Sequence, residues 1–115
     1  MIKVTNEELN TALYQKMFDE QEQYRDELLG LTPAEILDHA YEYTVREDIL
    51  LSLEYRALSD PMAKELLKSK TPLADIFSKW ENHETGYMDE IRDMIETHAE
   101  DLIRDAKEKA DRDAR

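Results

Sequence analysis

Three prolines fix where helices begin in this chain, because each directly follows a residue that caps helix N-termini. The pairs are Thr32-Pro33, Asp60-Pro61 and Thr71-Pro72. Proline suits the first helical turn, where its missing amide hydrogen costs nothing, and a preceding polar side chain accepts from that turn's amides. The pattern therefore predicts a helix from residue 33, a short one near 61–69, and a long one from residue 72.

Another helix is predicted at the N-terminus, where Thr5 to Glu8 forms a capping box and Gly30 ends the helix as a C′ residue. Apolar residues repeat at helical spacing between them: Leu9, Leu13, Met17, Tyr24 and Leu28. No segment alternates with the period of two that strands require. The sequence thus predicts an all-α protein, a compact bundle of four to five helices with a long C-terminal helix. We expect one domain over residues 1–104 and a polar, frayed tail over 105–115.

The segment after Pro72 carries one continuous stripe that keeps its phase past Gly86. It comprises Leu73, Phe77, Trp80, Glu84, Tyr87, Ile91, Met94, His98 and Leu102. This predicts either one helix of about 40 residues or a break near Asn82–Gly86, since glycine costs about 1 kcal/mol inside a helix. In the second half, Met88, Ile91, Ile95, His98 and Leu102 follow the 4-3 spacing of a coiled-coil seam.

The stretch from His39 to Tyr55 poses the sharpest local question. Tyr41 and Tyr43 lie at opposite margins of one helical stripe, where tyrosine rings pack and hydroxyls reach water. Glu47 and Asp48, however, fall on the stripe itself. Either Thr44 to Glu47 is a second capping box that breaks the helix, or a single long helix pairs Glu47 or Asp48 inside with Arg or Tyr.

Residues 49–58 are apolar around nearly the whole helix circumference. Such a helix is normally packed by neighbours on more than one face. We therefore expect this segment to form the core of the bundle.

The net charge of −13, from 28 acidic and 15 basic side chains, disfavours contact with phosphate backbones. We expect no direct binding of nucleic acid. The chain has no cysteine, no apolar run long enough to span a membrane, and no signal-peptide core near its start. A cytoplasmic protein without membrane contact is the expectation.

Catalytic and metal-binding patterns are not evident. Di-iron bundles use Glu-x-x-His, but the residues three before His39, His83 and His98 are Ile36, Trp80 and Ile95. No serine lies in a glycine-framed turn or beside a histidine, and two isolated glycines cannot build a phosphate loop. We expect no enzyme activity, no cofactor and no metal.

Three runs resemble an uncharacterised bacterial family, catalogued only as a domain of unknown function. They are EQEQYRDELL (20–29), EILDHAYEYTVREDILLSLEY (35–55) and ELLKSKTPLADIF (65–77). The resemblance implies a small acidic protein of gut Firmicutes, encoded among conjugative or plasmid-like genes. It brings no assigned activity and no known site residues.

The functional expectation is a non-enzymatic, acidic helical protein that occupies the surface of a protein partner. One version is an inhibitor that mimics the charge of nucleic acid in a basic groove of a host defence protein. The alternatives are a structural homodimer formed through the long helix, and a metal or small-ligand bundle built on His39, His98 and nearby carboxylates. The candidate interaction surface comprises Glu20, Glu22, Asp26, Glu27, Glu42, Asp89, Glu90, Asp93 and Glu96, and the possible buried or capping cluster comprises Thr44, Glu47 and Asp48.

Overall fold

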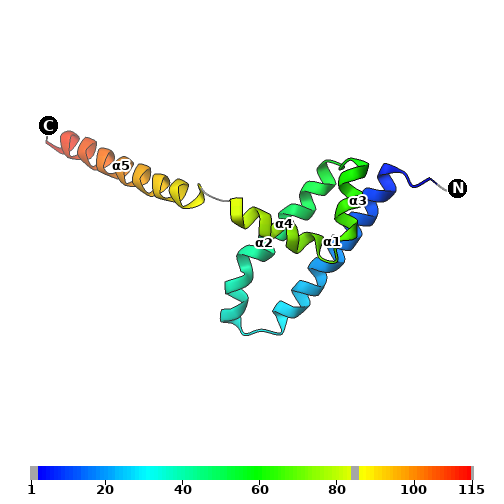
Figure 1. The fold of residues 1–115 in the computed structure, drawn as a ribbon. Helices are drawn as coiled ribbons and strands as arrows, with labels where there is room; N and C mark the ends of the chain where they lie inside the picture. The colour runs from blue at the N-terminus through cyan, green and yellow to red at the C-terminus, as the bar shows by residue number, and fades with distance from the viewer. Residues whose placement is uncertain (1–2, 84–85, 115) are drawn as a thin grey trace. The chain divides into compact units, whose positions relative to one another are not determined.

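The computed structural model describes residues 3–83 and 86–114, and over these residues all regular secondary structure is helical. The described residues form five helices, drawn in Figure 1, which confirms the predicted all-α class and the long C-terminal helix. They are α1 (Asn6–Leu29), α2 (Pro33–Tyr55), α3 (Asp60–Lys68), α4 (Pro72–His83) and α5 (Tyr87–Asp113).

The chain divides into two compact units, Met1–Glu81 and Asn82–Arg115. The first contains α1, α2, α3 and nearly all of α4, and the second is built around α5. No residue of α5 is buried among those described, so the bundle consists of the first four helices. The expected boundary at residue 104 falls inside α5, which continues to Asp113.

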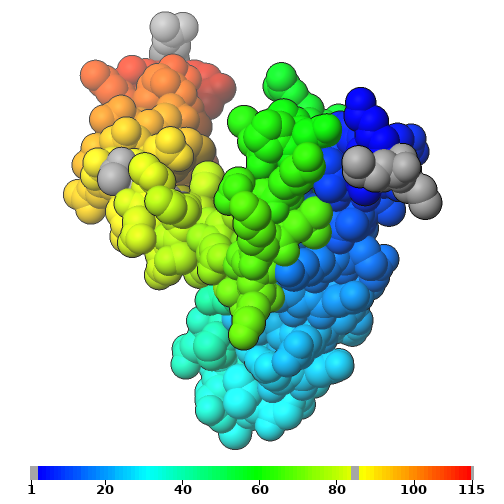
Figure 2. Space-filling view, turned by 45° about the vertical axis from the view of Figure 1, so that its right-hand side comes forward, coloured from blue at the N-terminus to red at the C-terminus, as the bar shows by residue number. Residues whose placement is uncertain are grey.

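The core of the first unit lies along one face of α1. Leu9, Leu13 and Met17 are buried there, as their helical spacing predicts. They meet Leu50 of α2, Ala63 of α3 and Leu73 of α4. In Figure 2 the residues of α3, in green, lie directly against those of α1, in blue.

Residues 49–58 do not form the centre of the bundle as expected. Leu50 is buried and Ile49 and Leu53 are partly buried, but Leu51 and Tyr55 are exposed. The second half of α2 therefore packs on one side only, because α1 lies on that side and the opposite side remains open to solvent.

The caps at Thr5 and Thr32 act as predicted, whereas α3 begins without a side-chain cap at its N-cap residue, Ser59. Thr5 accepts a hydrogen bond from the Glu8 amide, and Thr32 and Glu35 form a complete capping box around Pro33. Gly30 ends α1, but its φ of −84° is right-handed. The helix closes through a tight turn in which the Leu31 amide donates to the Leu28 carbonyl, rather than through a left-handed C′ glycine.

The stripe after Pro72 is not one continuous helix. The helix α4 ends at His83, Gly86 is a bend, and α5 begins at Tyr87. Glu84, a member of the predicted stripe, lies outside the described residues together with Thr85. Of the two alternatives, the break near Asn82–Gly86 is correct.

The connection from α2 to α3 is held against α1 by two asparagines. The Leu58 amide donates to Asn10 Oδ1 at 2.8 Å, and Asn10 Nδ2 donates back to the Leu58 carbonyl at 3.0 Å. Asn6 Nδ2 donates to Asp60 Oδ1 at 2.7 Å. These bonds satisfy backbone groups that no helix pairs, and they fix the C-terminal end of α2 beside the start of α1.

Candidate functional site

The helix α2 passes through Thr44 without a break, so the continuous-helix alternative is correct and the capping-box alternative is wrong. Thr44, Glu47 and Asp48 are all exposed, however, so no carboxylate of this cluster is buried as that alternative supposed. The polar residues that are buried instead are Gln21 of α1 and Arg46 of α2, exposed by 1% and 8%.

Gln21 joins α1 to α2 at the level of Glu47. Its Nε2 donates to the Tyr43 carbonyl at 3.2 Å and to Glu47 Oε1 at 3.0 Å. Its Oε1 is buried and has no hydrogen-bond partner among the described residues. Exchanging the amide's oxygen and nitrogen would bring two acceptors against the oxygen, so the contacts fix this orientation.

Arg46 extends the polar contact toward α4. One terminal nitrogen lies 2.6 Å from Glu42, the other 4.0 Å from Glu20, and the guanidinium carbon is 4.0 Å from the Tyr24 ring centroid. An arginine with little solvent exposure is best tolerated when its guanidinium stacks on an aromatic ring and pairs with carboxylates. Burial, and then the Glu42 charge, raise the pKa of the Tyr24 phenol.

Glu20 caps a helix to which it does not belong. Its two carboxylate oxygens accept from the Leu73 and Ala74 amides of α4, at 2.8 and 2.9 Å. These amides are in the first turn, which has no intrahelical partners and carries the positive end of the helix dipole. The local capping residue Thr71 donates to Asp75 instead.

Two adjoining hollows form a groove along α1 and α2. The first, about 110 Å³, includes Phe18, Gln21 and Leu51 in its lining. The second, about 340 Å³, includes Asn6 and Asn10. Both are lined by Tyr14 and Glu54, whose side chains are joined by a 2.8 Å hydrogen bond, so they adjoin there.

Negative charge gathers along this groove. Its described lining includes four glutamates, Glu7, Glu22, Glu47 and Glu54, and no basic residue. The hydrogen bond to Glu54, followed by burial, raises the pKa of Tyr14. Burial, followed by the Glu47 charge, raises the pKa of Tyr43.

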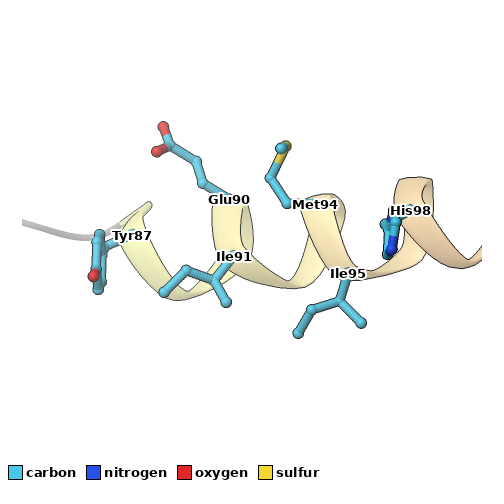
Figure 3. Close-up of a pocket in the computed structure, with 6 residues that line it drawn as sticks. All are labelled: Tyr87, Glu90, Ile91, Met94, Ile95 and His98. Atoms are coloured by element: carbon cyan, nitrogen blue, oxygen red, sulfur yellow. The ribbon is translucent and has the colours of Figure 1, made fainter.

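A second candidate surface is the apolar face of α5, which we define as Met88, Ile91, Ile95, Leu102 and Ile103. All five are exposed, Met88 by 70% and Ile95 by 57%. Figure 3 shows Ile91 and Ile95 pointing to one side of the helix, with Glu90 and Met94 on the other.

The predicted interaction residues separate into groups. Glu20 and Glu42 are engaged within the bundle by the α4 amides and Arg46. Glu22, Asp26 and Glu27 are exposed on α1. Asp89, Glu90, Asp93 and Glu96 are exposed on α5 and belong to the other unit, so these residues do not form one surface that the structure defines.

The histidines considered for a metal site also belong to different units. His39 Nδ1 lies 3.2 Å from the Tyr24 hydroxyl on the bundle, and His98 is on α5. Over the described residues, no group of three or more histidine, aspartate or glutamate side chains is arranged to hold a metal ion.

Sequence reasoning missed Gln21 and Arg46. The signal for Gln21 is a gap in the α1 stripe, which passes from Met17 to Tyr24 although the next turn falls at residue 21. Arg46 has no comparable signal, because a single arginine at a stripe position is also typical of a solvated margin.

The fold and these surfaces define an acidic, all-helical protein with a polar contact within its first unit and an exposed apolar helix face on its second. Comparison with known proteins places the chain in a family: residues 9–108 match the model described as protein of unknown function (DUF3848), so the chain belongs to that family. No curated protein and no solved structure matches. Within the described residues, no helix is sufficiently long and apolar to cross a membrane.

Proposed function

We propose that this chain is a non-enzymatic interaction protein that binds a protein partner through the apolar face of α5. The supporting observation is that none of the described residues of this 27-residue helix is buried, although five large apolar side chains share one side of it. Covering such a face releases about 25 cal/mol per Å² of apolar surface. An apolar stripe on a charged helix is the arrangement by which helices dock into grooves.

The charge of α5 indicates which kind of partner surface it can bind. Between Tyr87 and Asp113 there are ten acidic and five basic residues, a net charge of −5 by subtraction. A partner surface that joins apolar and basic side chains matches both properties of α5. Mimicry of nucleic-acid charge, as an inhibitor of a host defence protein, is one specific form of this proposal. A cytoplasmic, bacterial, mobile-element setting is part of the same proposal and is supported by the family resemblance described above.

The test is an affinity pull-down with the full chain and two matched variants. Ile91→Glu/Ile95→Glu places two charges on the apolar face of α5. Thr97→Glu/Arg104→Gln changes the net charge by the same amount on the opposite side of the helix. Partners retained by the wild type and the second variant, but lost with the first, are the expected result.

Retention of the same partners by Ile91→Glu/Ile95→Glu would refute a role for this face. Charge mimicry also predicts that binding weakens as the salt concentration rises, because salt screens electrostatic contacts. Binding that is unchanged between low and high ionic strength would exclude mimicry and leave the apolar contact.

A structural homodimer is the second candidate, and the 4-3 spacing of Met88, Ile91, Ile95, His98 and Leu102 favours it. In that case light scattering at high micromolar concentration gives the mass of a dimer, and Ile91→Glu/Ile95→Glu gives that of a monomer. A monomer mass for the wild type throughout the concentration series removes this candidate.

A further inference from the structure

The smaller hollow of the α1–α2 groove gathers carboxylates that form no ion pair with another described residue. Glu47 accepts from Gln21, and Glu54 accepts from the Tyr14 hydroxyl at 2.8 Å, so both are oriented by neutral donors. Neither forms an ion pair with another described residue, whereas Glu42, Glu65 and Glu96 all do. A carboxylate has about four acceptor positions, which leaves several unfilled at each glutamate.

Gln21 supplies an independent observation at the same place. It lines this hollow, it is 1% exposed, and its Oε1 has no donor among the described residues. A buried oxygen without a donor costs about 1–3 kcal/mol, so such groups are normally satisfied by protein, water or a ligand. The polar groups at the hollow are therefore rich in acceptors: exposed carboxylates, and a buried amide oxygen of a lining residue that lacks a donor.

Two further properties select the group that fits. The hollow measures about 110 Å³, which is enough for the head group of one side chain but not for a larger ligand. The rings of Tyr14 and Phe18, stacked with centroids 6.2 Å apart, form one wall. A planar cation with several N–H donors packs on aromatic rings and donates to carboxylates at the same time.

We propose that this hollow binds the guanidinium group of an arginine side chain from a protein partner, with Glu47 and Glu54 as acceptors. The adjoining larger hollow, lined by Asn6 and Glu7, receives the residues next to that arginine. The inference goes beyond the proposed function, because it assigns a second contact on α1 and α2 that does not involve α5.

The experiment is an NMR titration of the ¹⁵N-labelled full chain with acetyl-arginine amide. Acetyl-citrulline amide, an uncharged analogue of the same shape, and acetyl-lysine amide are the comparisons. We expect saturable shifts of the Gln21, Glu47, Leu51 and Glu54 amides with the arginine compound, none with citrulline, and at least severalfold weaker binding of lysine. Shifts spread over all acidic helices, or equal affinity for lysine, would overturn the assignment.

Variants test the same contact independently. Glu47→Gln/Glu54→Gln is expected to weaken acetyl-arginine amide about tenfold, because two charge-assisted hydrogen bonds are lost. Asp26→Asn/Glu27→Gln removes the same charge from exposed positions of α1 outside the groove and is expected to change the dissociation constant less than twofold. Equal weakening of acetyl-arginine amide binding by both double variants would mean general attraction to an acidic protein and would refute the site.

Glu54→Gln alone keeps an acceptor for Tyr14 and serves if the double variant fails to fold. Because acetyl-arginine amide does not require α5, a negative result here leaves the pull-down outcome unaffected.

Discussion

Gln21 and Arg46 occupy buried positions that an apolar stripe would normally fill, and they decide how α1 and α2 meet. The Gln21 amide reaches both the backbone and a side chain of α2, so it fixes the relative position of the two helices along their axes. Hydrophobic contacts are non-directional and do not by themselves choose one register. The polar contact therefore adds specificity to a small core.

Replacing Gln21 tests this contact. We expect Gln21→Ala to lower the free energy of unfolding by about 1–3 kcal/mol, since it removes two hydrogen bonds and leaves a cavity in the helix contact. Urea unfolding followed by circular dichroism measures the change. Gln23→Ala, at an exposed position on the same helix, is the control and should stay within about 0.5 kcal/mol of the wild type.

Tyr43 gives the bundle a pH dependence at high pH. A raised pKa in the folded state means that folding favours the protonated phenol. Its stabilising effect is therefore complete below the ordinary tyrosine pKa of 10.0 and is lost as the pH rises above it. We expect the free energy of unfolding to fall as the pH rises above about 10, and to fall less in Tyr43→Phe. Tyr55→Phe, on an exposed side chain, should keep the wild-type slope.

The positions where helices begin could be predicted from the sequence, but whether α2 continues past Thr44 could not. Proline and capping residues act locally, so Thr32, Asp60 and Thr71 mark helix starts in the sequence and in the structure. The motif from Thr44 to Glu47 has the same local pattern, yet α2 passes through it, because Gln21 holds the Tyr43 carbonyl and Glu47 from another helix. That contact depends on tertiary packing, which the local pattern does not contain.

The carboxylate of Glu20 is expected to hold α4 against α1. Glu20→Ala leaves the Leu73 and Ala74 amides without their acceptor, which typically costs about 1 kcal/mol at a helix N-terminus. Urea unfolding should show that loss, and Glu20→Gln should show a smaller one because its amide oxygen still accepts. Glu22→Ala removes an exposed carboxylate of the same helix that forms no cap, and it is the control. An equal loss of stability in Glu22→Ala would attribute the effect to charge alone.

For the whole molecule, the division into two units could not be derived from the apolar stripe. Leu73 and Phe77 of α4 are buried, while Met88, Ile95 and Leu102 continue the same pattern on α5 and are exposed. Spacing identifies a face that is suited to burial but does not say what covers it. The groove on α1 and α2 could not be predicted from the sequence either, because residues 14, 21, 47 and 54 come together there from two helices.

Removing residues 82–115 tests the independence of the first unit. Because α5 contributes no buried residue to the core, we expect the chain ending at Glu81 to unfold cooperatively with a midpoint temperature within a few degrees of the full chain. Calorimetry measures both midpoints. A loss of cooperative unfolding in the shorter chain would show that α5 supports the bundle.

The exposed apolar face of α5 also affects how quickly its backbone amides exchange with deuterium. Isolated helices of this length are marginal in water, since their stability normally comes from packing of one face. Amides beside the buried core exchange only when that core opens, but we expect those of α5 to exchange at the rate set by the helix alone. A partner that covers Met88 to Ile103 would slow deuterium exchange along α5. Slower exchange in the presence of a cell extract would therefore reveal binding to this helix before the partner is identified.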